Sequence, residues 1–287
     1  MTAQAGGSTA QSAATRRLLA GGLLACPLLL FLAAAFYYPL AITLTQSVTP
    51  AHGGGWTLAH YADFLGSRDG LGTLALTLWL SFAATFFSIL LSLPLALLLR
   101  RRFFGRRALQ FLMMIPITIP ALIGALGLVI LYDRTGWINV VLTRLHLVST
   151  PLTIDYTISG LILFYVWMFF PYGGLVIVSG LGAIDPALEE AGLVMGATPF
   201  TVFRRVLLPL LRGSLWAGAV MIFLQCFGAF SIPLIAGGDY QPLGVRIYRV
   251  ANVFLDWPLA SAMAVVMGAI QAALVIAYQS ISRGRPA

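Results

Sequence analysis

The chain has 287 residues, of which 60% are apolar and only 9% carry a charge. This composition is typical of a polytopic membrane protein and argues against a soluble domain. All 17 basic residues are Arg, so the chain lacks the Lys that a P-loop ATPase or a Schiff-base enzyme requires. The net charge of +8 does not indicate nucleic-acid binding, because the basic residues flank apolar segments and form no soluble basic face.

Six apolar segments are long enough to cross about 30 Å of hydrocarbon as helices. The sequence therefore predicts an all-α membrane protein with six transmembrane helices. We expect residues 1–15, which show no periodicity, to be a disordered tail, and residues 16–287 to form the membrane domain. The predicted spans are Leu18–Thr45, Leu71–Leu99, Ala108–Tyr132, Thr157–Leu181, Ser214–Ala236 and Pro258–Ile281.

The distribution of charge predicts an orientation for these spans. If both termini are cytoplasmic, the inner segments contain twelve Arg and three acids, whereas the outer segments contain five Arg and six Asp. This asymmetry obeys the positive-inside rule. All nine acids lie outside the predicted spans, which argues against an ion-driven secondary transporter with a buried carboxylate. An intramembrane enzyme is also disfavoured, because no span contains Asp or His.

The second and third spans contain two further patterns. Hydroxyl residues recur about once per turn along one face of the second span, and we favour helix packing over pore lining as their role. Arg100–Arg107 is a basic turn that we expect to contact lipid at the inner leaflet. Pro116 and Pro120 predict a kink in the third span, at either a moving or a static surface. The hydroxyl residues are Thr73, Thr77, Ser81, Thr85, Ser88 and Ser92.

A charged cytoplasmic loop, 182–212, separates the fourth and fifth spans. Asp185 followed by Pro186 predicts a helix start, because Asp caps free N–H groups and Pro fits the first turn. Glu189 and Glu190 then lie at the positive end of the helix dipole. The first helix of the loop therefore begins at a defined residue and presents two carboxylates.

A second helix follows after a turn at Gly196, a residue that adopts the left-handed conformation without steric cost. Thr198 and Pro199 repeat the cap-plus-Pro start, and Pro209 is expected to end this helix. Arg204 and Arg205 lie off its apolar stripe. A helix, a turn and a helix between two spans indicate a docking element, with an ordinary amphipathic loop as the disfavoured alternative.

The spacing of this loop resembles the EAA loop of bacterial ABC-importer permeases. The family pattern is Glu-Ala-Ala, three residues, Gly, nine residues, then Ile-x-Leu-Pro. Gly192 occupies a position where the family usually has Ala, and Val206 one where it often has Ile. In the family this loop is a coupling helix that enters a cleft on the ATPase. The resemblance thus assigns ATPase coupling to Glu189, Glu190, Ala191, Gly192, Gly196, Arg204, Arg205 and Pro209.

The same resemblance implies a MetI-like type I importer fold in the bacterial inner membrane, without enzymatic activity or a cofactor of its own, because ATP binds the partner. The implied partners are a pair of ATPase subunits, a second permease and a periplasmic or lipid-anchored solute-binding protein. Phe227–Pro233 resembles the spermidine/putrescine-type branch, which favours a polyamine solute and a second permease of different sequence. Ferric iron and aminoalkylphosphonates are the competing solutes.

Gln225 is a polar residue in the apolar fifth span, so we expect it to face the bundle interior. It is either part of the translocation path, with Phe227 and Phe230, or the donor of an interhelix hydrogen bond. No metal site is expected, because His52 and His60 lie far from the only other His.

Overall fold

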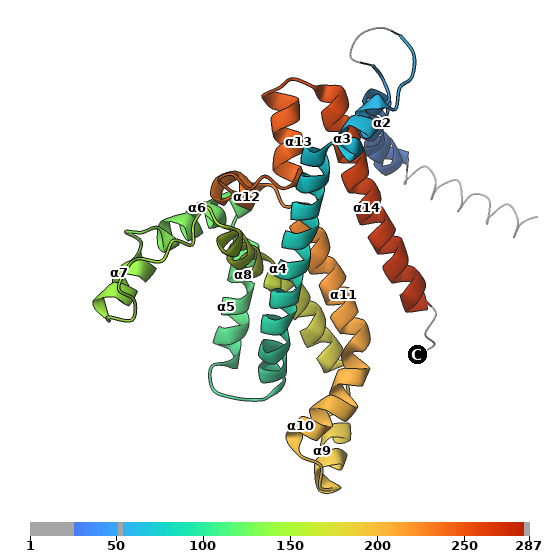
Figure 1. The fold of residues 1–287 in the computed structure, drawn as a ribbon. Coiled ribbons are helices and arrows are strands. Elements are labelled where there is room, and N and C mark those ends of the chain that lie inside the picture. The colour runs from blue at the N-terminus through green and yellow to red at the C-terminus, as the bar shows by residue number, and fades with distance from the viewer. Residues whose placement is uncertain (1–25, 51–53, 284–287) are drawn as a thin grey trace, which may run out of the picture.

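The computed structural model describes residues 26–50 and 54–283. The predicted tail 1–15 lies outside these residues. All regular structure in the described part is helical, as Figure 1 shows. By length and composition it includes six candidate membrane helices, which confirms the predicted class. They are Cys26–Ser47, Arg68–Arg100, Ala121–Arg144, Ile158–Gly182, Pro199–Phe227 and Trp257–Ser280.

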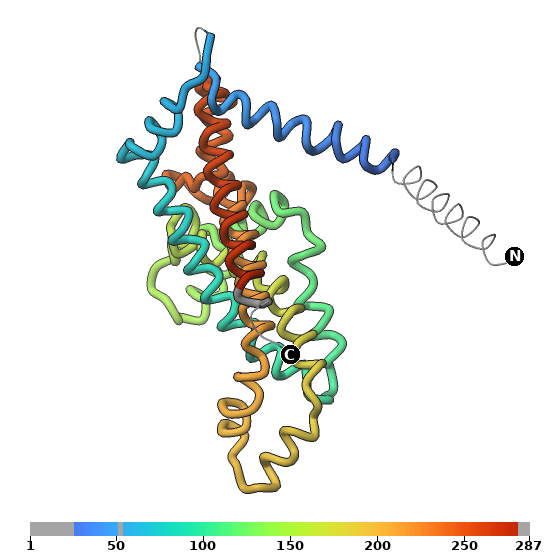
Figure 2. The backbone as a smooth tube through the Cα atoms, turned by 90° about the vertical axis from the view of Figure 1, so that its right-hand side faces the viewer, coloured from blue at the N-terminus to red at the C-terminus, as the bar shows by residue number. Residues whose placement is uncertain are grey.

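Most of the first span lies apart from the other helices, and its end packs on the last one. It contains a π turn, η1 (Ala33–Tyr37), and continues into α2 (Tyr38–Ser47), which contacts α14 (Trp257–Arg283). Figure 2 shows the span running away from the bundle. Almost all its side chains are exposed, so lipid or another subunit must cover them, since a membrane helix has no contact with bulk water along its length.

Three helices form the centre of the bundle: α4 (Arg68–Arg100), α8 (Ile158–Gly182) and α11 (Leu208–Phe227). Gly173 of α8 and Gly218 of α11 lie at the crossing point of their helices. A Cβ atom on Gly218 would lie 3.2 Å from the Gly173 Cα atom. The two glycines therefore allow a close backbone approach that a larger residue would prevent.

The hydroxyl face of α4 packs inside this centre, as predicted. Of its six residues, all except Thr85 are buried. The Ser92 hydroxyl donates a hydrogen bond of 2.8 Å to the carbonyl oxygen of Phe170 in α8. The Thr77 hydroxyl accepts one of 2.8 Å from the backbone N–H of Leu243. Two of the six hydroxyl residues thus join α4 to its neighbours by hydrogen bonds.

The third predicted span, Ala108–Tyr132, is not one helix. The structure has α5 (Arg106–Thr118) and α6 (Ala121–Tyr132), which leaves the line of α5 in Figure 1. The break lies at Ile119, whose ψ is 127°. A residue that precedes a proline is sterically driven from the helical region into an extended conformation, so Pro120 causes a full break where only a kink was predicted.

The fifth predicted span, Ser214–Ala236, also has different bounds. Its helix begins before Ser214 and ends at Phe227, and Ser231–Ala236 forms a separate short helix, α12. Pro233 has no N–H to donate to the Ala229 carbonyl, so a continuous helix would lose a hydrogen bond there. The predicted span therefore joined parts of two elements.

Three short helices lie outside the central bundle, between the membrane helices. They are α3 (Ala59–Gly66), α7 (Trp137–Arg144) and α13 (Leu243–Asn252). Helix α3 contacts α4 and α14, and α13 contacts the same two helices. These contacts gather α3 and α13 at the end of the bundle where α4 begins, opposite the 182–212 loop (Figure 1).

Candidate functional site

The loop between α8 and α11 forms a helical hairpin. Its first leg is α9 (Ala187–Val194), and its second leg begins with α10 (Pro199–Val202) and a π turn, η2 (Phe203–Leu207). Figures 1 and 2 both show it extending beyond the turn between α4 and α5. The hairpin therefore projects from the bundle at one end and is open to a partner.

Local signals predicted both starts of the hairpin and its turn. The Asp185 carboxylate accepts a hydrogen bond of 2.9 Å from the Ala187 N–H, and the Thr198 hydroxyl accepts one of 3.2 Å from the Thr201 N–H. Gly196 has a φ of +87°, in the left-handed region. The caps satisfy N–H groups that have no partner within the helix, and the turn needs a glycine.

Pro209 does not end the second leg, contrary to the prediction. A continuous helix runs from Pro199 to Phe227, with Pro209 in the first turn of α11. Immediately before it, the Leu208 N–H bonds to the Phe203 carbonyl five residues back. This wider π turn adjusts the ladder where proline supplies no N–H, so the second leg and the membrane helix form one element.

The two legs touch at Gly192. A Cβ atom on this buried residue would lie 3.0 Å from the Val202 Cγ2 atom. That distance is shorter than ordinary van der Waals contact, so alanine would require Val202 to shift by a few tenths of an ångström. Glycine at this position therefore sets the close packing of the legs.

The far end of the hairpin presents a mixed surface, which we call the tip surface: Glu190, Val194, Met195 and Phe200. Val194 is 88% exposed, Met195 82% and Phe200 69%, and Glu190 is also exposed. A cluster of exposed apolar residues beside a charge is typical of a protein interaction site. The exposed members of the predicted coupling set are Glu190, Ala191, Gly196, Arg204 and Arg205.

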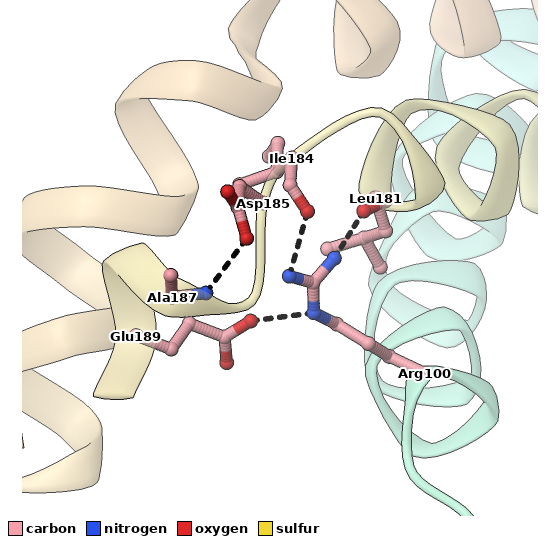
Figure 3. A network of polar contacts seen from close by, with 6 residues as sticks. All are labelled: Arg100, Leu181, Ile184, Asp185, Ala187 and Glu189. Carbon is pink, nitrogen blue, oxygen red and sulfur yellow. Dashed lines mark hydrogen bonds and ion pairs between the residues drawn. The ribbon is translucent and has the colours of Figure 1, made fainter. Parts of the chain in front are cut away.

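Glu189 differs from its neighbour, because it turns back toward the membrane helices. Its carboxylate lies 2.5 Å from the Nε atom of Arg100, the last residue of α4. The same guanidinium donates through Nη1 to the Leu181 carbonyl and through Nη2 to the Ile184 carbonyl at 3.0 Å. Figure 3 shows this network. One side chain thus joins the ends of α4 and α8 to α9.

Sequence reasoning missed this role of Arg100, which it placed with the basic turn at the inner leaflet. The Arg100 side chain is 14% exposed, whereas Arg101 and Arg102 are exposed. A usable signal was that Arg100 is the last residue of α4, whereas Arg101 and Arg102 lie beyond the end of the helix. Its guanidinium can therefore face α8, and theirs project outward.

The candidates for a translocation path are separated by the fold. Gln225 is exposed on the surface of the chain, so the prediction that it faces the interior of this bundle is wrong. Phe227 is fully buried against other helices, and Phe230 is half-buried. The interhelix bond in this region comes instead from Gln271, whose amide donates to the Leu224 carbonyl at 3.3 Å.

The described residues include no group of three or more His, Cys, Asp or Glu side chains arranged to hold a metal ion. The polar groups of the hairpin are instead divided between internal contacts and an exposed face. The exposed face combines charged and large apolar side chains.

Sequence comparison identifies a protein family and several relatives that this chain matches. The profile described as "binding-protein-dependent transport system inner membrane component" matches residues 88–284. The chain is 27% identical over 179 residues to the spermidine/putrescine transport system permease protein PotB of Escherichia coli (strain K12), covering 62% of this chain and 65% of PotB. It is 26% identical over 239 residues to the trehalose/maltose transport system permease protein MalF of Thermococcus litoralis, covering 79% and 80%. The match to PotB thus spans just under two thirds of that relative.

Structural comparison gives the same fold. A bacterial ABC transporter involved in the import of alginate matches with a TM-score of 0.76 at 19% identity, covering 97% of this chain and all of that one. The MetNI methionine ABC transporter, in an inward-facing conformation, matches with a TM-score of 0.57 at 20% identity, covering 76% and 98%. The chain therefore belongs to the family of binding-protein-dependent transport system inner membrane components, and it has the MetI-like fold of the ABC transporter chains that it matches.

Proposed function

We propose that this permease is coupled to separate ATPase subunits through its hairpin. The observation that carries the proposal is the projecting tip surface, where Glu190 and large apolar side chains are exposed together. Exposed apolar groups favour burial against a partner, and a single carboxylate among them selects a complementary basic group. Each ATPase subunit would supply a cleft of that kind.

Movement of a docked hairpin reaches the membrane along its second leg. Because the helix from Pro199 to Phe227 is continuous, displacement of its tip must tilt or shift the part that packs on α4 and α8. ATP binding and hydrolysis in the partner would supply the force. The central helices would then alternate between inward-facing and outward-facing arrangements.

The chain supplies half of the pore in this proposal, and a second permease of different sequence supplies the other half. The exposed position of Gln225 supports a path formed between chains. Both termini and the hairpin lie in the cytoplasm, as the excess of Arg on that side favours. At the opposite end, α13 meets a periplasmic or lipid-anchored solute-binding protein.

The proposed solute is a polyamine. The similarity to PotB and the pattern in Phe227–Pro233 support it. The chain is also 26% identical over 192 residues to the putative ferric transport system permease protein FbpB 1 of Haemophilus influenzae, covering 67% of this chain and 30% of FbpB 1. Ferric iron is therefore the second candidate, with an aminoalkylphosphonate as the third. Uptake of labelled spermidine, putrescine, ferric iron and an aminoalkylphosphonate by cells with the complete system distinguishes them.

The docking proposal is tested by Glu190→Lys in the assembled transporter. Reversing a charge at an interface costs a few kcal/mol, so we expect solute uptake to fall about 30-fold or more while the permease is still inserted. Glu190→Gln should have a smaller effect. Wild-type uptake by the Lys variant, or labelling of a cysteine at 190 from the periplasmic side, would refute the docking role.

A further inference from the structure

The first leg of the hairpin has no continuous helix to connect it to the membrane. Helix α8 ends at Gly182 and α9 begins at Ala187, and the four residues between them are not helical. A segment of this kind bends more easily than a helix, because its backbone groups lack the repeating hydrogen bonds. The covalent link alone therefore transmits little force from α9 to α8.

Arg100 spans this break. Its guanidinium bonds to Leu181 in the last turn of α8 and to Ile184 inside the break, and it pairs with Glu189 beyond the break. Arginine suits the position, since its planar fork serves several acceptors at once and retains its charge when partly buried. The Leu181 carbonyl lies in the last turn of α8 and accepts the guanidinium as well as the Ile184 N–H at 3.2 Å, and a cationic side chain suits this negative end of a helix.

The opposite end of α4 carries a second ion pair. The Asp69 carboxylate, in the first turn of α4, pairs with Arg246 of α13. Among the side chains of residues 26–50 and 54–280, these are the two ion pairs that the structure shows, and both lie at the ends of this helix. Thr77 adds a hydrogen bond from α4 to the first residue of α13.

We propose that α4 is a connecting rod between the hairpin and α13, with Arg100 as the positioning residue that makes α9 move with it. The inference rests on the proposed docking function. Helix α4 has 33 residues and continues through Pro94 without a break, which corresponds to a length of about 50 Å at 1.5 Å per residue. A shift of the docked hairpin therefore reaches α13 along a single helix.

The ion pairs at the two ends of α4 differ in their exposure to water. The Arg100–Glu189 pair is partly buried, with side chains 14% and 28% exposed, whereas the Asp69 side chain is 68% exposed. Exposed pairs contribute little because water screens them, but removing one partner from a pair that is shielded from water leaves a charge that is less well compensated. The inner end should therefore be the sensitive one.

The test uses the complete transporter in lipid, with ATP hydrolysis and solute uptake measured on the same preparation. Arg100→Ala should lower uptake about tenfold per ATP hydrolysed, the size expected when a coupling network loses one member. Arg100→Lys should restore part of this ratio, since an ammonium keeps the charge without the fork. Arg102→Ala, which removes an exposed Arg from the following turn, is the matched control and should leave the ratio within about twofold.

Glu189→Gln is the control for a folding defect, because it preserves the size of the side chain and removes only the ion pair. It should also lower uptake per ATP, and combining it with Arg100→Ala should add little further loss. An unchanged ratio in both variants, with Glu190→Lys still inactive, would overturn the role of Arg100 and leave docking intact. If Glu190→Lys were harmless as well, the docking proposal itself would fail.

Discussion

The two legs of the hairpin are attached to the membrane helices in different ways. The second leg continues without a break into α11, so backbone hydrogen bonds hold it in line. The first leg follows a non-helical segment, and the side chain of Arg100 holds it against α4 and α8. A continuous helix and a single guanidinium thus serve the same purpose. The difference means that backbone changes should damage one leg, and side-chain changes the other.

The largest effect is expected when the second leg is broken. Arg205→Pro removes a donor and introduces a clash inside the Pro199–Phe227 helix, at a cost of about 3 kcal/mol. The hairpin would then hinge at η2, and uptake should be abolished in a membrane-inserted protein. Arg205→Ala separates the two contributions, because it removes the exposed side chain that the resemblance assigned to coupling but preserves the backbone, and we expect it to lower uptake much less. Equal loss in both variants would show that the side chain matters and the continuity of the helix does not.

An intermediate effect is expected when Arg100 is replaced. Hydrogen bonds to a charged group contribute about 1.5–3 kcal/mol each, so Arg100→Ala should lower the local opening free energy of α9 by about 2 kcal/mol. Hydrogen exchange in the assembled transporter should accelerate in Ala187–Val194 and stay unchanged in α11. Faster exchange spread evenly over both legs would contradict the idea that they are held independently.

The fold was predictable where the signal was local. Six apolar segments gave the number of spans, and the recurrence of Thr and Ser in α4 gave its buried face. The predicted bounds of the third and fifth spans were wrong for the same reason. Hydropathy reports which residues prefer lipid, whereas Pro120 and Pro233 decide where the backbone ladder ends. An apolar run can therefore contain two helices.

The sequence predicted the hairpin itself, but it did not predict how the hairpin is attached to the membrane helices. Asp185, Gly196 and Thr198 act within a few residues of their own position, so sequence spacing sufficed. The contact between Arg100 and Glu189 joins residues far apart in the chain, and no periodic pattern records it. The wrong placement of Gln225 has a related cause, because a polar residue in a span signals a need for a partner but not which chain supplies it.

The smallest effect is expected at Gly192, where two opposing effects nearly cancel. Alanine favours the helical state of α9 by about 1 kcal/mol relative to glycine. It also crowds Val202, which a Cβ atom would approach to 3.0 Å, and overpacking of this kind costs about 1 kcal/mol or more. Gly192→Ala should therefore change the stability of the hairpin by less than about 0.5 kcal/mol, measured by hydrogen exchange in α9. The double variant with Val202→Ala removes the crowding and should expose the helix-forming gain. If that double variant were instead less stable than Val202→Ala alone, crowding by Val202 would not be what offsets alanine at this position, and the close contact of the legs would depend on another feature of glycine.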